Sequence, residues 1–163
     1  MTAPSITLRQ RAWDAAAAVP DPELPMLTIA ELGILRAVEI VDDRVEVSIT
    51  PTYSGCPAMT AIALDIDTAL HGAGIENARV RLVLSPAWTT DWLTAEARAK
   101  LVAAGIAPPG PRASSRLFGT VPPPCPRCGS TATERIAEFG ATACKSLWRC
   151  TVCREPFDHF KCH

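Results

Sequence analysis

Two cysteine pairs near the end of the chain constrain its fold more than any other feature. Cys125 and Cys128 form the first pair, and Cys150 and Cys153 form the second, each with two intervening residues. This spacing lets both thiolates of a pair point at one ion, and Gly129 lets the backbone turn beneath it. Two pairs at this separation predict tetrahedral coordination by four thiolates. We therefore expect these four cysteines to bind one metal ion.

The segments between the two pairs predict a small ribbon that depends on its metal. Residues 133–139 and 143–149 are strand-like, as the hairpin of a zinc ribbon would be. A module of roughly 40 residues buries too little apolar surface to fold alone, so the metal supplies much of its folding free energy. We favour Zn²⁺, although iron or an iron–sulfur cluster would use the same four thiolates.

Four further side chains in the tail are candidate accessory ligands, namely Cys144, His159, Cys162 and His163. Cys144 lies in the same strand-like run as Cys150 with an even separation, so we expect both side chains on one face. Each of the four, taken singly, is better explained as an ordinary buried or polar residue than as a ligand. Taken together, they indicate a second, weaker metal site or a thiol-exchange site.

The preceding residues predict a small α+β domain of order α-β-β-α-β-α. The first helix has a helical apolar rhythm, with Ser5 as a candidate N-cap and Pro20 beyond its end. Asp42 and Asp43 separate two alternating runs, which indicates a β-hairpin with a tight turn. Thr94 is a candidate N-cap for the last helix. The expected helices cover residues 6–18, 58–70 and 94–104, and the expected strands cover 34–40, 45–49 and 78–84.

Proline marks the boundary between the two halves of the chain. Seven of the 15 prolines fall between residues 108 and 126, and a segment of this composition is extended and semi-rigid. We therefore expect an α+β domain over residues 1–107, a proline-rich linker over 108–123 and a four-cysteine zinc ribbon over 124–163.

The first domain contains a single cysteine, Cys56, where an expected strand gives way to an expected helix. A thiol at a helix N-terminus meets free N–H groups and the positive end of the helix dipole, so we expect its pKa to be lowered. Such a thiolate can ligate iron or a cluster, or act as a nucleophile, but a second copy or a partner must supply the remaining ligands. The alternative is a buried cysteine that behaves as a small hydrophobe.

The acidic loop that contains Asp21 and Glu23 is a candidate source of hard ligands or a contact for a partner. The alternative is an ordinary loop with a capping aspartate. No hydrolase-like constellation and no phosphate-binding glycine loop are present in the sequence, so we expect no catalytic residues.

Charge and hydropathy argue against several classes of function. The formal net charge is −1, with 8 Lys and Arg against 13 Asp and Glu through residue 108, and 8 against 4 beyond it. The basic tail has no Lys/Arg run, so nucleic acid is not the expected partner. No apolar run reaches the length of a membrane span, and the N-terminus lacks a signal-peptide pattern. We expect a cytoplasmic protein whose seven cysteines stay reduced.

The first domain resembles the SufT-like domain of iron–sulfur assembly factors over residues 5–105. The residues that carry this resemblance are Asp21-Pro22-Glu23, Glu31-Leu32-Gly33-Ile34, Thr50-Pro51-Thr52, Gly55-Cys56-Pro57 and Trp88. The whole chain resembles the PaaD family of accessory subunits encoded with the bacterial ring 1,2-phenylacetyl-CoA epoxidase. The additional residues are Ser85-Pro86-Ala87-Trp88, Gly105-Ile106-Ala107-Pro108-Pro109, the four ribbon cysteines, Phe139-Gly140, Cys144-Lys145 and the tail from Glu155 to His163.

The resemblance implies a role in aerobic phenylacetate breakdown. The family's enzyme has a di-iron oxygenase subunit and a reductase subunit that carries flavin and a [2Fe–2S] centre. The resemblance makes both subunits the expected partners and assigns Cys56 as the reactive cysteine. It also assigns the four ribbon cysteines as metal ligands.

Three functions therefore follow as hypotheses. The leading one is a maturation factor without activity of its own, in which Cys56 transiently holds iron or an iron–sulfur cluster. The second is a stoichiometric structural or electron-transfer subunit of the oxygenase complex. The third, a weaker alternative, is a zinc ribbon that binds nucleic acid. A homodimer that shares a cluster across a two-fold axis is a further hypothesis.

Overall fold

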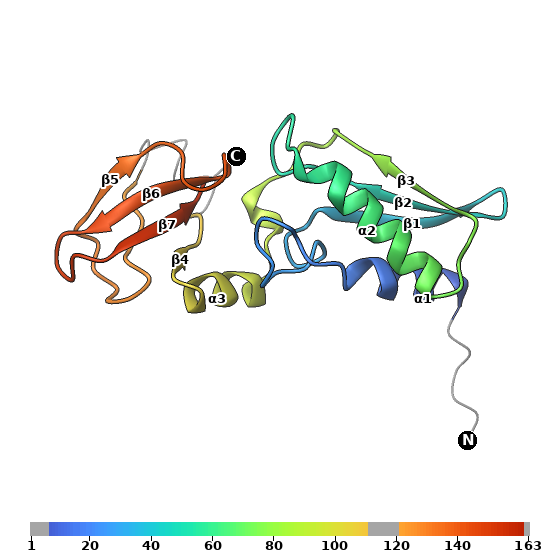
Figure 1. The fold of residues 1–163 in the computed structure, drawn as a ribbon, viewed down its shortest axis with the longest axis horizontal. Helices are drawn as coiled ribbons and strands as arrows, with labels where there is room; N and C mark the ends of the chain where they lie inside the picture. Colours follow the sequence, from blue (N-terminus) through green and yellow to red (C-terminus); the bar gives the residue numbers. More distant parts are fainter. Residues whose placement is uncertain (1–6, 111–120, 162–163) are drawn as a thin grey trace, which may run out of the picture. The chain divides into compact units, whose positions relative to one another are not determined.

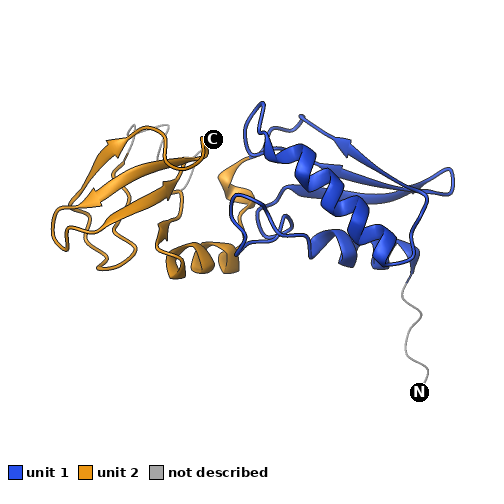
Figure 2. Ribbon diagram, viewed as in Figure 1, with its two compact units in different colours: residues 1–88 blue, residues 89–163 orange. Residues whose placement is uncertain are grey.

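The computed structural model describes residues 7–110 and 121–161. Within these ranges the chain forms two compact units, Met1–Trp88 and Thr89–His163 (Figure 2). No helix in the described ranges combines the length and the apolar character that crossing a membrane requires.

The first unit contains a three-stranded sheet and two helices (Figure 1). The sheet has the order β1-β2-β3, in which β2 pairs antiparallel with β1 and parallel with β3. Because β2 and β3 are parallel, the chain must cross from one end of the sheet to the other between them. Helix α2 makes this crossing and begins near the carboxyl end of β2. The elements are α1 (Leu8–Ala17), β1 (Leu35–Val41), β2 (Arg44–Ile49), α2 (Ala58–Gly72) and β3 (Ala78–Leu82).

The β1–β2 hairpin turns at two aspartates in the left-handed region. Asp42 has φ 49° and Asp43 has φ 59°, and the strands pair directly on either side, with Val41 opposite Arg44. Two consecutive residues with positive φ define the type I′ turn, whose twist matches that of the strands. Aspartate tolerates this conformation better than most residues, which explains the predicted turn.

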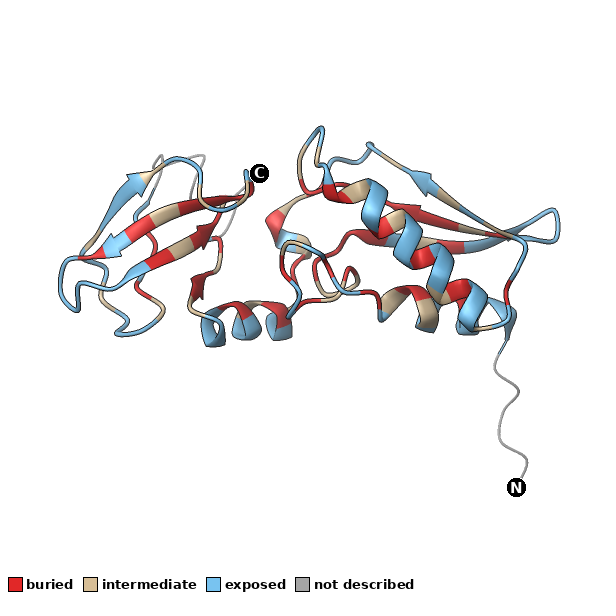
Figure 3. Ribbon diagram, viewed as in Figure 1, coloured by how far each residue is buried: buried red, intermediate tan, exposed pale blue. Residues whose placement is uncertain are grey.

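Helix α2 and strand β2 each bury one side in the core of the first unit. The helix buries one stripe at four-residue spacing, which is the side that Figure 3 draws in red. Strand β2 buries Val45, Val47 and Ile49 at alternate positions, and Ser48 between the last two is buried as well. Each fully buried Ile, Leu or Val contributes about 1.5–3 kcal/mol to folding. The buried residues are Ala58, Ile62, Ile66 and Leu70 on α2, and Val45, Val47 and Ile49 on β2.

The second unit contains a four-stranded sheet of order β4-β7-β6-β5. The short strand β4 pairs parallel with β7, and the other neighbours are antiparallel. A buried cluster beside this sheet includes Ala107, Trp148 and Phe157. The elements are the 3₁₀ helix η1 (Thr90–Trp92), α3 (Ala95–Ala103), β4 (Ile106–Ala107), β5 (Thr133–Ala137), β6 (Lys145–Cys150) and β7 (Pro156–Phe160).

One arginine ties the start of the second unit to the segment after β4. The guanidinium of Arg98 on α3 donates to the carbonyl of Thr90 at 2.8 Å and to that of Pro109 at 2.6 Å. Helix α3 begins at the predicted cap, because Thr94 Oγ1 accepts the N–H of Ala97 at 3.0 Å. Segments on both sides of the helix are therefore held by one charged side chain.

The fold class and the element order α-β-β-α-β-α are confirmed, and so is the β5–β6 hairpin. Helix α1 is capped by Thr7, whose side chain accepts the N–H of Gln10, whereas the predicted cap Ser5 lies outside the described residues. Strands β4 and β7 were not predicted. The compact units divide at residue 88, so the structure groups α3 and β4 with the ribbon, and the expected boundaries at 107 and 123 stay predictions.

Candidate metal centre and the Cys56 loop

The four predicted ribbon cysteines meet at one point in the second unit. Their sulfur atoms all lie within 4.8 Å of one another. The Sγ atoms of Cys125 and Cys153 are 3.7 Å apart, and those of Cys128 and Cys150 are 3.6 Å apart. A tetrahedral ion with Zn–S bonds of about 2.3 Å requires S–S distances of about 3.8 Å. The donor set therefore fits a tetrahedral, thiolate-bound ion such as Zn²⁺.

The two cysteine pairs have the same backbone design. The N–H of Cys125 donates to the carbonyl of Ser130 at 2.9 Å, and the N–H of Cys150 donates to the carbonyl of Glu155 at 3.0 Å. Each bond closes a turn of the same length around one pair. The two turns are equivalent knuckles, and they bring their thiols together from opposite sides of the ion site.

A left-handed residue follows each pair. Gly129 has φ 75°, as predicted from its sequence, and Arg154 has φ 65° at the corresponding place in the second knuckle. Glycine adopts this conformation without steric cost, whereas arginine does not. Because the second turn has arginine in place of glycine at this position, the sequence indicated that turn only through the spacing of its two cysteines.

The local hydrogen bonds prepare the cluster to bind a cation. The N–H of Cys153 points at the sulfur of Cys150 at 3.5 Å and lowers the pKa of Cys150 to about 6, against the effect of burial. The amide of Glu155 also acts to lower the pKa of Cys153, but burial and the hydrogen bonds to the other thiols raise it to about 12. Four neighbouring thiols cannot all ionise without a compensating cation, and a divalent ion supplies that charge.

Cys144 lies at the opposite end of β6 from Cys150. Its thiol is buried and pairs with Thr142 Oγ1 at 3.0 Å, while its carbonyl accepts the N–H of Lys161 at 2.9 Å. These contacts are those of a packed core cysteine. Within the described residues the metal group contains the four ribbon cysteines and leaves Cys144 out, so its role as an accessory ligand stays a prediction.

His159 is a buried side chain on β7. Its ring stands edge-on to Trp148 with 6.1 Å between centroids. Burial, followed by the charge of Lys161, lowers its pKa to about 4, so the ring is neutral near pH 7. The metal group of the described residues leaves out His159 as well. Cys162 and His163 lie outside the described residues, and the second site proposed for the tail stays a prediction.

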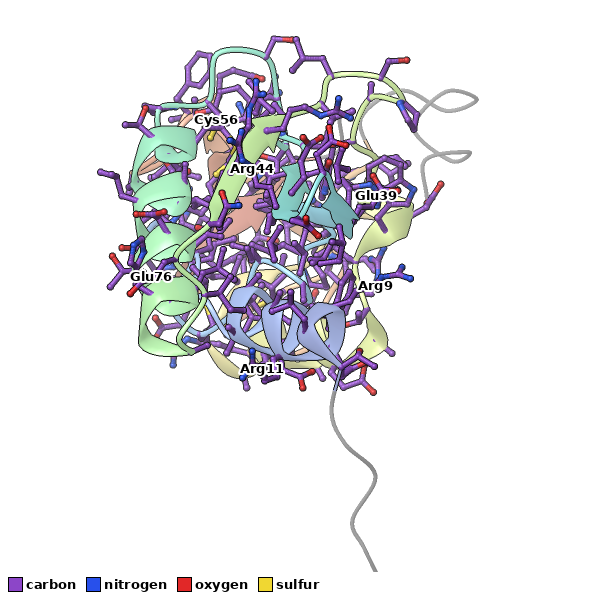
Figure 4. The ribbon with its side chains drawn as sticks, turned by 90° about the vertical axis from the view of Figure 1, so that its right-hand side faces the viewer. Arg9, Arg11, Glu39, Arg44, Cys56 and Glu76 are labelled. Carbon is purple, nitrogen blue, oxygen red and sulfur yellow. The ribbon has the colours of Figure 1, made fainter. Side chains whose placement is uncertain are left out.

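Cys56 lies in the loop between β2 and α2, at the end of α2 where that helix begins (Figure 4). Its thiol is partly exposed. The N–H of Cys56 donates to the carbonyl of Tyr53 at 3.2 Å, and its carbonyl accepts the N–H of Met59 at 3.4 Å. Gly55, with φ 78°, lets the loop turn just before the cysteine.

The predicted lowering of the Cys56 pKa is wrong. Burial raises the pKa, and this effect outweighs the N–H of Ala58, which acts to lower it. The negative charge of Glu23 raises it further, as does that of Asp21. Helix position alone indicated a thiolate, whereas the folded environment keeps the thiol protonated at neutral pH.

The acidic loop is therefore an electrostatic neighbour of the thiol, as its charge effect shows. Asp21 is buried, and its Oδ1 accepts the N–H groups of Glu23 and Leu24, both at 2.8 Å. This pattern is the capped loop that the sequence left open as an alternative. The role of Asp21 and Glu23 as metal ligands stays a prediction.

One side chain beside the thiol, that of Tyr53, was not predicted from the sequence. The side chain of Tyr53 hydrogen bonds to Cys56 and acts to lower its pKa. Tyr53 is the single tyrosine of the chain and stands three residues before the cysteine, and this short separation was the available signal.

Two family models match the chain. The one described as PaaD zinc beta ribbon domain matches residues 110–161. The one described as iron-sulfur cluster assembly protein matches residues 9–83. The first match covers all four cysteines of the metal group, and the second covers Cys56 and the acidic loop.

Curated proteins and solved structures give the same division. A protein of Escherichia coli K12 that is named as a subunit of 1,2-phenylacetyl-CoA epoxidase is 47% identical over 152 residues, which are 92% of this chain and 90% of that protein. The Fe–S protein maturation auxiliary factor SufT of Staphylococcus aureus is 35% identical over 51% of this chain and 96% of its own length. The crystal structure of a DUF59 domain from Bacillus anthracis matches 57% of this chain and 90% of that domain, with TM-score 0.52 and 25% identity.

Proposed function

Because the chain belongs to the PaaD family of 1,2-phenylacetyl-CoA epoxidase subunits, we propose that it is an accessory maturation factor of the phenylacetyl-CoA epoxidase system in aerobic phenylacetate catabolism. In this proposal it assists the assembly of an iron or iron–sulfur centre in a partner subunit and has no activity of its own. The oxygenase and reductase subunits of that system are the proposed clients.

The observation that carries this proposal is the state of Cys56. Its thiol is partly exposed and lies in the unit whose sequence matches iron–sulfur cluster assembly proteins. It also stands outside the closed four-thiolate group of the described residues. A carrier needs incompletely coordinated ligands, because a fully coordinated ion is not released to a client. A single thiol meets this requirement.

The raised pKa of Cys56 means that iron has to compete with a proton for the thiol. Iron must displace the proton of a thiol that burial and the charge of Glu23 keep protonated. The carboxylates of Glu23 and Asp21 are candidate hard ligands next to the sulfur. The remaining ligands would come from the client or from a second copy of the chain.

The ribbon has a different proposed role. Its four thiolates complete the coordination of one ion, which leaves no open position for transfer chemistry. We assign the ribbon a structural Zn²⁺ and a part in holding the client. This division gives the two metal-binding features of the chain separate tasks.

Anaerobic purification of the wild type, Cys56→Ser and Ser54→Ala tests this division. Ser54 is exposed in the same loop, so Ser54→Ala is a matched control. We expect one zinc per chain in all three, with visible absorption or additional iron after anaerobic iron and sulfide loading in the wild type and Ser54→Ala alone. Equal iron content in Cys56→Ser would contradict the proposal. Iron in the ribbon itself would instead favour an electron-transfer subunit.

A further inference from the structure

A groove opens between helix α2 and strand β3 in the first unit. Its volume is about 480 Å³, and mainly apolar side chains line it from both elements. Leu64 on α2 is 64% exposed and Leu82 on β3 is 50% exposed. Single exposed apolar residues need no explanation, but several gathered in one groove mark an interaction site. The other apolar residues of the groove are Ile49, Met59, Ala63, Ala78 and Val80, and its polar residues are Thr60, Asp67 and Arg79.

The groove is a second apolar stripe on α2 and not a gap in the core. The core-facing stripe is already complete, because Ile62 and Ile66 are fully buried. Met59 and Ala63 repeat at the same four-residue spacing, one position further around the helix, and line the groove together with Asp67, which continues that spacing. Met59 and Ala63 are partly exposed and Leu64 is exposed, so this side of α2, which Figure 3 draws in tan and pale blue, carries apolar side chains outside the core.

Strand β3 has an open edge beside the groove. It is the last strand of the sheet and pairs with β2 alone within the described residues. The carbonyl of Asn77 and the N–H of Val83 bond to β2. Since successive residues of a strand turn their amides to opposite sides, the N–H and C=O groups of Ala78, Val80 and Leu82 face the open edge. Such an edge is a template for one more strand.

The far face of β3 carries positive charge. Arg79 and Arg81 alternate along β3 with Ala78, Val80 and Leu82, so their side chains turn to the other face of the sheet, although Arg79 also borders the groove. Arg81 pairs with Glu46 at 3.2 Å, whereas no carboxylate of the described residues forms an ion pair with Arg79. If two copies of β3 paired edge to edge and antiparallel about Val80, Arg79 would stand opposite Arg81. Like charges directly opposite each other oppose that pairing.

We propose that the α2/β3 groove binds an extended segment of a partner protein in which acidic and apolar residues alternate, added as a fourth strand along β3. The apolar residues of that segment would fill the groove, and its acidic residues would lie beside Arg79 and Arg81. The groove begins one helical turn from the thiol, since Met59 lines it and donates its N–H to the carbonyl of Cys56. A bound segment would thus lie next to the proposed carrier.

The identification of the partner as a client rests on the proposed function, but the strand addition itself does not. The test uses the full-length, zinc-loaded chain and two fluorescent seven-residue peptides, one alternating valine with glutamate and one alternating valine with lysine. Anisotropy at low salt measures binding, and backbone amide exchange of β3 reports the mode. Arg79→Glu is the test variant. Arg11→Glu, an equal charge change at an exposed position on α1 (Figure 4), is the control.

We expect the glutamate peptide to bind the wild type more tightly than the lysine peptide and to slow the exchange of Val80 and Leu82. Arg79→Glu should lower the affinity for the glutamate peptide about five-fold and raise the affinity for the lysine peptide. Arg11→Glu should leave the ratio of the two affinities unchanged. Absence of binding at millimolar peptide, or equal binding of both peptides by the wild type, would overturn the inference. Exchange already slowed by self-association before peptide is added would overturn it as well, in favour of a second copy as the occupant.

The same peptides separate this inference from the proposed function. Cys56→Ser should bind the glutamate peptide as the wild type does, because the thiol side chain is not part of the groove. Peptide binding together with equal iron loading of Cys56→Ser would refute the carrier role alone. Iron loading that depends on Cys56, without peptide binding, would refute the groove alone.

Discussion

Loss of one ribbon ligand should unfold the ribbon and leave the first unit intact. Cys150 is fully buried and belongs both to the metal group and to the small buried cluster of the second unit. Cys125 has the same double role, so two of the five side chains in that cluster belong to the metal group. The ribbon therefore has little core that is independent of its ion.

The size of the effect follows from sharing the metal's binding free energy among four thiolates. Structural zinc sites supply about 10–16 kcal/mol, so one thiolate of four accounts for about 2.5–4 kcal/mol. Cys150→Ser should therefore weaken zinc binding roughly 100- to 1000-fold. Cys144→Ser is the matched control, since Cys144 is equally buried but lies outside the metal group of the described residues.

Zinc competition with a chromophoric chelator measures the affinity, and amide hydrogen exchange locates the unfolding. We expect Cys150→Ser, or chelation of the wild type, to remove protection from β6 and β7 while the amides of α2 stay protected. Cys144→Ser should keep the zinc affinity of the wild type. Strands β6 and β7 that remain protected after complete zinc removal would refute the reasoning, as would an equal loss of affinity in Cys144→Ser.

Three further predictions concern single side chains. Glu23→Gln should lower the pKa of Cys56 and Tyr53→Phe should raise it, as measured by the pH dependence of Cys56 alkylation with peptide mass spectrometry; unchanged profiles would contradict the assigned neighbours. The pKa of His159 falls from 6.5 to about 4 on folding, so the unfolded state binds more protons in that window and stability should decline as pH falls from 6.5 towards 4, by at most about 3 kcal/mol. Comparing wild type with His159→Gln in urea titrations isolates this contribution, and parallel pH profiles would refute it. Asp43→Val should cost about 1–2 kcal/mol at a φ of 59° whereas Asp43→Gly should not, and equal melting temperatures of the two variants would argue against the type I′ turn.

Features that depend on neighbouring residues could be predicted from the sequence. The hairpin turn at Asp42 and Asp43, the cap at Thr94 and the two cysteine pairs each depend on a few consecutive residues and known local geometry. The interactions that determine these features involve only a few consecutive residues, so the sequence pattern predicts the observed structure.

Features that depend on distant residues could not be predicted. Strand β4 has two residues, too few for a periodic signal, and it exists because it pairs with β7 about 50 residues later in the sequence. The pKa of Cys56 was predicted with the wrong sign for a related reason. Its position suggested the helix terminus, but Glu23 and the surrounding burial act on it through space. Such effects require the folded arrangement.

Direct transfer of metal to a client subunit tests whether Cys56 carries iron or a cluster. The wild type, Cys56→Ser and Ser54→Ala would be loaded anaerobically with ⁵⁷Fe and sulfide, then mixed with the metal-free reductase or oxygenase subunit. Mössbauer spectra of the re-isolated client measure the transfer. We predict labelled centres from the wild type and Ser54→Ala, and none above the protein-free control from Cys56→Ser. Equal transfer by all three chains would contradict the account.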